Sequence, residues 1–69
     1  MFNLNKFKAQ MALRGMTGRE VSQKMGINEA TFYRKLKDNG NFNRQEINNL
    51  IDILGIESPE EIFFADELA

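Results

Sequence analysis

The side chains best suited to binding a ligand in this sequence are basic, and they gather toward one end of the chain. All nine lysines and arginines lie within residues 1–44, where only three acidic residues accompany them, a net charge of +6. Residues 45–69 hold the other seven acidic residues and no basic one, a net charge of −7. This asymmetry indicates a surface that binds a polyanion, backed by an acidic surface elsewhere. The alternative is a chance segregation of solvated charges.

Residue types that most enzymes and metal sites require are missing. The chain has no cysteine and no histidine. A thiol nucleophile, the usual zinc sites and the commonest general base are therefore excluded. No glycine-rich phosphate loop occurs, and the carboxylates fall mostly on predicted helix surfaces. The sequence predicts a protein that is not an enzyme and has no metal, no cofactor and no small-molecule substrate.

Length and composition predict one small domain that spans residues 1–69. The chain is near the lower size limit for folding on a single core, and its hydrophobic fraction of 42% is ordinary for a globular protein. No run approaches the roughly 18 apolar residues that span a membrane, and no signal-peptide pattern opens the chain. We therefore expect a soluble, cytoplasmic protein with no membrane partner.

Residues 17–37 carry the signals of two short helices joined by a tight turn. Thr17 is a good N-cap, and Glu20 three residues later closes a capping box. Gly26 supplies the left-handed conformation that ends the first helix, and Asn28 caps the second. Two apolar pairs, each spaced four residues apart, mark the inner faces: Val21 with Met25, and Phe32 with Leu36. The segment predicts a helix-turn-helix.

Three further helices are expected around it. The first is capped by Asn3 or Asn5, runs to about Arg14 and ends at Gly15. Its inner face is formed by Leu4, Phe7, Met11 and Ala12.

Asparagine-rich residues 38–43 form a loop with Phe42 as its buried anchor.

The second half of the chain predicts helices over 44–54 and 59–68. Asn43 and Glu46 form another capping box, and Gly55 ends the helix that follows. The inner stripe of that helix is Ile47, Leu50, Ile51 and Leu54. Ser58 caps the last helix, with Pro59 at its first position. With no strand pattern, the expected fold is all-α, five short helices around one core.

The stretch TGREVSQKMGINEATFYRKL, preceded by a helix and followed by FNRQEINNLIDILGI, resembles the lambda-repressor-like helix-turn-helix family of phage repressors and Cro proteins. The matching signals are Thr17, Val21, the 25–27 turn and Phe32. The resemblance covers nearly the whole chain. It is closest to short Cro-like or repressor-like regulators of phages from Gram-positive hosts, whose endings EEIFFADELA resembles.

Two positions depart from the family pattern. The family usually has a glutamine after the cap, which touches a phosphate and braces the recognition helix, whereas this chain has Gly18. It commonly has an alanine in the middle of the first helix of the helix-turn-helix, where Ser22 stands here. The first departure removes an expected side-chain contact, and the second exchanges one small residue for another.

The resemblance implies that Glu29, Ala30 and Arg34 reach base edges, and helix geometry adds Tyr33 to the outward face. An arginine can bind guanine O6 and N7 together, and an alanine can contact a thymine methyl. Glu29, Arg34 and Tyr33 each have an alternative role. Glu29 either accepts from cytosine or stabilises its own helix N-terminus. Arg34 either binds a base or pairs with Asp38, and Tyr33 either contacts DNA or covers Phe42.

Phosphate contacts are expected from side chains at helix N-termini and along the basic surface. These residues are Thr17, Arg19, Asn28, Lys37, Asn41 and Asn43. The asparagines of the loop have turn formation as the alternative role.

The last helix is expected to form a dimer interface from Phe63, Phe64 and Leu68. Since adjacent helical residues face different ways, one of the two phenylalanines is expected in the core and the other at the surface. Related repressors dimerise through this helix. The sequence thus predicts a transcriptional regulator that binds a double-stranded DNA operator as a homodimer. The alternative is a helix-turn-helix module, such as an antirepressor or antitoxin, that binds another protein and does not read DNA.

Overall fold

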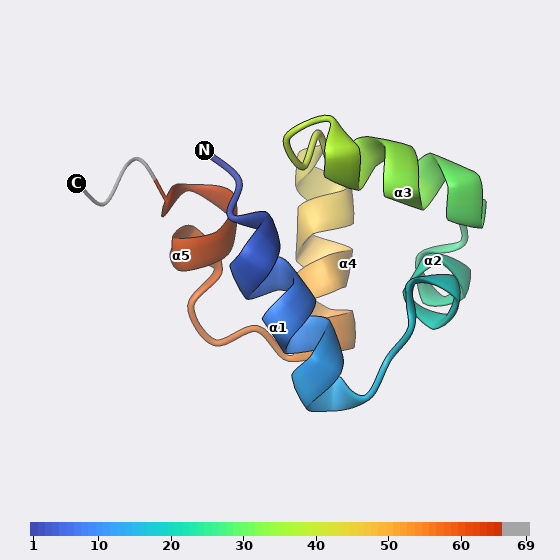
Figure 1. The fold of residues 1–69 in the computed structure, drawn as a ribbon, viewed down its shortest axis with the longest axis horizontal. Coiled ribbons are helices and arrows are strands. Elements are labelled where there is room, and N and C mark those ends of the chain that lie inside the picture. The colour runs from blue at the N-terminus through green and yellow to red at the C-terminus, as the bar shows by residue number, and fades with distance from the viewer. Residues whose placement is uncertain (66–69) are drawn as a thin grey trace.

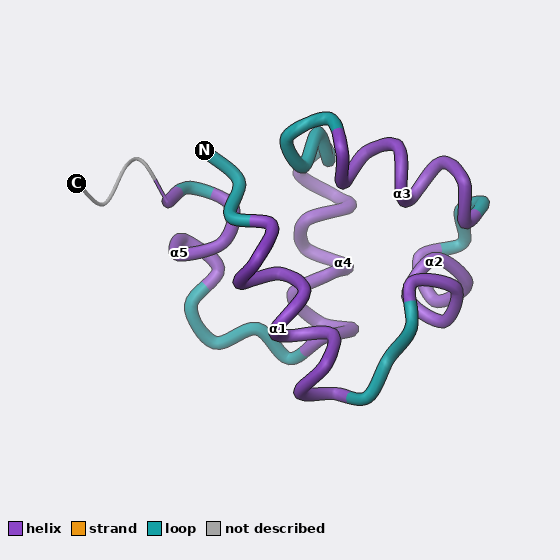
Figure 2. The backbone as a smooth tube through the Cα atoms, viewed as in Figure 1, coloured by secondary structure: helices purple, strands orange, loops and turns teal. Residues whose placement is uncertain are grey.

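The computed structural model describes residues 1–65, which form five α-helices and no strand (Figure 1). The all-α prediction is confirmed. The helices are α1 (Leu4–Arg14), α2 (Gly18–Met25), α3 (Glu29–Lys37), α4 (Arg44–Leu54) and α5 (Pro59–Phe63). In the view of Figure 1, α2 and α3 lie to one side of α4, and α5 lies on the other side beyond α1. Short loops connect them (Figure 2).

The helix starts follow the capping signals in the sequence. In the capping box of α2, Glu20 N donates to Thr17 Oγ1 at 3.2 Å and Thr17 N donates to Glu20 Oε1 at 3.2 Å. In α4, Glu46 N donates to Asn43 Oδ1 at 2.8 Å and Asn43 N donates to Glu46 Oε1 at 2.9 Å. Both predicted boxes are confirmed. Asn3, rather than Asn5, caps α1.

Phenylalanine rings from distant parts of the chain form the centre of the core. Phe7 of α1 lies 6.2 Å from Phe32 of α3 and 6.4 Å from Phe42 of the loop, between ring centroids. All three are buried, and the expectation that Phe42 anchors the loop is confirmed. Phe2, which sequence patterns did not single out, closes this cluster from the N-terminal segment, with its ring centroid 5.5 Å from that of Phe7.

Three expectations about helices need correction. Ala12 is exposed, because the side of α1 that meets the core consists of Leu4, Phe7 and Met11. Ser58 makes no side-chain cap hydrogen bond, since its backbone (φ −126°, ψ 71°) is outside the extended conformation that the other four N-caps adopt. Within the described residues the last helix ends at Phe63; residues 66–68 of the predicted range lie outside them. At Phe64 the backbone leaves helical geometry, and Ala65 N donates to Met1 O at 3.2 Å.

No helix within residues 1–65 combines the length and the apolar character needed to cross a membrane.

Candidate nucleic-acid interface

The outward face of α3 is determined by the residues that anchor its inner face. Phe32 is fully buried and Leu36 is 5% exposed, so the helix cannot rotate without unburying both. Its first turn is fixed by Asn28, whose side chain accepts from Ala30 N at 2.7 Å. The four residues predicted to read bases, Glu29, Ala30, Tyr33 and Arg34, are all exposed. The structure therefore brings them together on one helix at the surface.

The unpaired positive charge of the described chain is concentrated beside this face. Three cations have partners in the described chain. Lys6 Nζ lies 3.8 Å from Glu61 Oε1, and Lys35 forms an ion pair with Glu46. Arg14 donates to backbone carbonyls. The other six cations form no ion pair or side-chain hydrogen bond within residues 1–65. Of these, Arg19 and Lys24 lie on α2, Arg34 and Lys37 on α3, and the remaining two are Lys8 and Arg44. The helix-turn-helix thus has four cations available for an anionic ligand.

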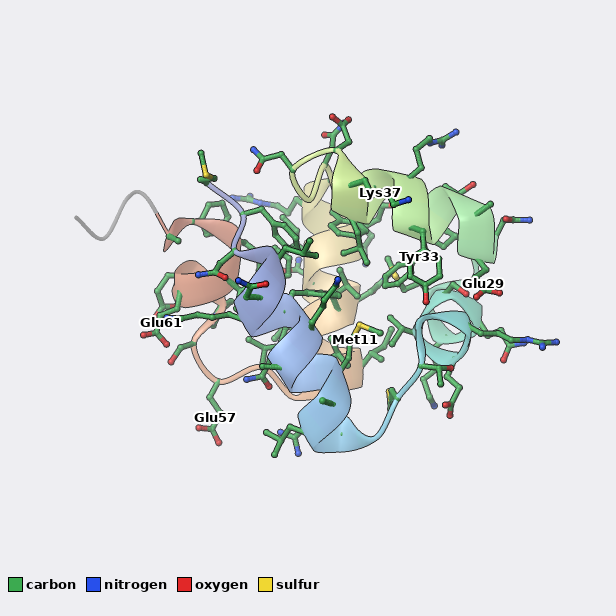
Figure 3. All side chains as sticks on the ribbon, in the orientation of Figure 1. Met11, Glu29, Tyr33, Lys37, Glu57 and Glu61 are labelled. Atoms are coloured by element: carbon green, nitrogen blue, oxygen red, sulfur yellow. The ribbon has the colours of Figure 1, made fainter. Side chains whose placement is uncertain are left out.

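Two acidic side chains of the second half, Glu57 and Glu61, lie away from this face. Figure 3 shows Glu61 at α5 and Glu57 on the loop that precedes it, both across the molecule from Lys37 on α3. A polyanion approaching α3 would therefore meet the basic side of the molecule, despite the net charge of −1.

Arg34 has no competing partner in the described chain. Pairing with Asp38 was the alternative reading, but Asp38 Oδ2 instead accepts from Asn41 Nδ2 at 3.1 Å. No ion pair joins Arg34 to Asp38 in residues 1–65. Its guanidinium is free to donate to an acceptor on a ligand.

Tyr33 leans across to α2 instead of pointing straight outward. Its ring packs edge-on against Phe32, with centroids 5.5 Å apart, and its hydroxyl end reaches Gly18 (Figure 3). Tyr33 does not cover Phe42, because the one aromatic ring that Tyr33 contacts within residues 1–65 is that of Phe32. The side chain remains 41% exposed.

Glu29 keeps both of its readings. It is the first residue of α3, where a carboxylate favours the positive end of the helix, and it is exposed with no ion pair among residues 1–65. Figure 3 shows it at the end of α3 nearest α2.

The six predicted phosphate contacts are all exposed, but they differ in how free their polar atoms are. Arg19 and Lys37 have no side-chain partner in the described chain. The Thr17 hydroxyl already donates to Glu20 Oε1 at 3.2 Å, and Asn41 donates to Asp38. Asn28 and Asn43 use their side-chain oxygens as helix caps, which leaves their amide NH₂ groups to donate.

Two side-chain contacts between helices were missed in the sequence. Lys35 Nζ of α3 donates to Glu46 of α4, at 2.8 Å to Oε1 and 2.7 Å to Oε2. Partial burial alone would raise the pKa of Glu46, but the hydrogen bonds from Lys35 and from Asn43 N outweigh it and lower the pKa. The second contact is that of Arg14, which donates to Leu54 O at 2.7 Å and to Gly55 O at 3.0 Å. Since both contacts join separate helices, no local spacing signals them.

The two adjacent phenylalanines of the predicted dimer face divide between core and surface, as expected. Phe63 is only 7% exposed and packs in the core, 5.8 Å from Phe2 between ring centroids, which leaves little of it for a partner. Phe64 is 42% exposed and lies beside a shallow hollow. The hollow is lined by Arg44, Ile47, Asn48, Ile51, Pro59 and Phe64. Leu68, the third predicted residue, lies outside the described residues.

Nothing in the described chain resembles a metal centre, since residues 1–65 hold no group of three or more acidic side chains placed to ligate an ion.

The sequence model of one protein family, described as a Cro/C1-type HTH DNA-binding domain, matches residues 6–66. This range includes all of α2 to α5 and most of α1. No curated protein and no solved structure matches the chain.

Proposed function

Because this chain belongs to the Cro/C1-type helix-turn-helix family of DNA-binding domains, we propose that it is a transcriptional regulator that reads a specific operator in double-stranded DNA. The observation that carries the proposal is the set of four cations on α2 and α3 that form no ion pair within residues 1–65, together with the exposed outer face of α3. Neutralising phosphates with lysine and arginine supplies much of the affinity of such proteins for DNA.

In the proposed complex, α3 enters the major groove. Arg34 binds guanine O6 and N7, Ala30 contacts a thymine methyl, and Glu29 either accepts from cytosine N4 or only stabilises its helix. Arg19 and Lys37 bind phosphates, assisted by the capping residues at the helix N-termini. These contacts fix the register of α3, so that Arg34 is the main source of base preference.

We further propose that the protein is a Cro-like or repressor-like regulator of phage or prophage origin that binds a palindromic operator as a homodimer. Two recognition helices would then enter successive major grooves about 34 Å apart. Bound at a promoter, the dimer would exclude RNA polymerase. The exposed Phe64 beside Ile47 and Ile51 supports an apolar contact between copies.

The proposal is tested with Arg34→Ala and Lys37→Ala on an operator obtained by binding-site selection from random DNA. Arg34→Ala should cost about 1–3 kcal/mol on that operator and relax the preference at one base pair. Lys37→Ala, the matched control on the same helix, should weaken all sequences alike and reduce the salt dependence. Both are measured by fluorescence anisotropy titration over a range of salt concentrations.

Two results would contradict this proposal. Absence of binding to any DNA at low salt would overturn DNA recognition as a whole. If Arg34→Ala lowered only non-specific affinity, its role as a base reader would be wrong while DNA binding stood.

A further inference from the structure

Gly18 stands at a position where the backbone does not require glycine. It is the first residue of α2, and its φ is outside the left-handed region, unlike the four other glycines of the chain. Glycine is among the least favourable residues in a helix, whereas alanine is the most favourable. The reason for glycine here must therefore lie outside its own backbone conformation.

The space that a side chain at residue 18 would need is filled by Tyr33. A Cβ at this position would overlap the Tyr33 hydroxyl oxygen and Cζ, and would lie 3.1 Å from Cε1. The ring also packs edge-on against that of Phe32, which is fully buried. Figure 3 shows Tyr33 extending from α3 to α2, so it spans the gap between the two helices.

We propose that Tyr33 is a positioning residue: its ring, seated on Gly18, fixes the distance and angle between α2 and α3. Gly18 is the residue that admits it. The inference rests on the proposed function only in that α3 is the helix presented to DNA. It gives Tyr33 a different role from the base reader expected from the sequence, because a spacer affects all DNA sequences equally.

The pairing is tested first without DNA, by a double-mutant cycle of Gly18→Ala and Tyr33→Ala. With Tyr33 present, Gly18→Ala should lower the melting temperature, because the new methyl group and the ring compete for one space. In the Tyr33→Ala background the same change should raise it, since only the higher helix propensity of alanine remains. If Gly18→Ala raises the melting temperature in both backgrounds, the pairing is wrong.

A spectroscopic test needs only the single variant, so it stands even if Tyr33→Ala does not fold. Tyr33 is the one tyrosine and the chain has no tryptophan, so intrinsic tyrosine emission reports on this ring alone. Gly18→Ala should increase quenching by acrylamide, because the displaced ring moves into solvent. Gln23→Ala, at an exposed position of the same helix, is the matched control and should leave quenching unchanged. Equal quenching of wild type and Gly18→Ala would overturn the proposal.

The DNA test separates a spacer from a base reader. Tyr33→Phe keeps the ring and should bind the selected operator within about twofold of wild type. Tyr33→Ala should weaken binding to the operator and to each of its single-base variants by the same factor. A changed preference at one base pair, or an equal loss in Tyr33→Phe and Tyr33→Ala, would overturn the spacer role. If the wild type binds no DNA, the proposed function fails, while melting and quenching still decide the pairing.

Discussion

At the scale of single residues, the Glu46 carboxylate has two structural roles at once. It closes the capping box of α4 through Asn43 N at 2.9 Å and accepts from Lys35 on both oxygens. Burial works against the charged form, yet these donors hold the pKa below the ordinary glutamate value. A lowered pKa in the folded state means that the charge stabilises the fold above about pH 4.3, the unfolded value, and that this contribution is lost as the pH falls through the folded pKa.

Glu46→Gln tests this contribution, since glutamine can still close a capping box but carries no charge. We expect the free energy of unfolding at pH 7 to fall by about 1–2 kcal/mol. The difference from wild type should shrink as the pH falls through the lowered pKa of the folded state, because the wild-type carboxylate then becomes protonated as well. Urea denaturation at pH 7, 5 and 3 measures it.

Glu20→Gln is the matched control, because Glu20 closes the capping box of α2 but has no lysine partner within residues 1–65. Its effect should be smaller and should change less with pH. A deficit for Glu46→Gln that stays constant from pH 7 to pH 3 would show that shape, and not charge, accounts for the loss.

At the scale of helices, the C-terminus of α4 is completed by a side chain from α1. The Arg14 guanidinium donates to Leu54 O and Gly55 O, two carbonyls at the end of a helix that has no basic residue of its own in its last turn. A cation at this end is also favoured by the helix dipole. Arg14 therefore serves helix packing, which distinguishes it from the cations of α2 and α3.

Arg14→Ala should lower the free energy of unfolding by about 1 kcal/mol, a value reduced from that of a buried charged hydrogen bond because the site is partly solvated. DNA affinity at a temperature where both proteins are folded should stay unchanged. Lys8→Ala on the same helix, exposed and without a partner in the described chain, should alter stability little. Loss of DNA affinity in folded Arg14→Ala would show instead that Arg14 contacts phosphate.

The helices also show which features a sequence can and cannot predict. Thr17 with Glu20 and Asn43 with Glu46 were predictable, because a capping box joins residues three apart. The pairs Lys35–Glu46, Arg14–Leu54 and Tyr33–Gly18 were not, since each depends on how two helices dock. For the same reason the face of α3 was predicted from Phe32 and Leu36, while the inward lean of Tyr33 on that face was not.

The residue at which the last helix ends was not predicted, for a related reason. The apolar residues after Pro59 continue a helical pattern, but α5 ends at Phe63 and Ala65 N donates to Met1 O. An acceptor at the opposite end of the sequence leaves no trace in the local pattern.

At the scale of the whole molecule, the proposed dimer depends on Phe64 and the hollow beside it. Phe64→Asp should shift the protein toward the monomer in analytical ultracentrifugation, because a charge would have to be buried between copies. It should also weaken binding to a two-half-site operator while leaving binding to one half-site unchanged. Leu13→Asp, at an apolar residue of α1 that is 70% exposed, is the control and should change neither. An unchanged mass for Phe64→Asp would place the dimer contact elsewhere.

The contact between Phe2 and Phe63 has a consequence for how the protein is made. The two rings lie 5.8 Å apart, although they belong to opposite ends of the described chain, and Asn3 N donates to Ile62 O at 2.7 Å beside them. A chain growing on the ribosome would complete its helix-turn-helix long before residue 63 emerges. Until then the aromatic cluster around Phe7 would lack Phe63, and the apolar surface that Phe63 covers would stay exposed to water. The core that anchors α3 would therefore be complete only after Phe63 has packed against Phe2.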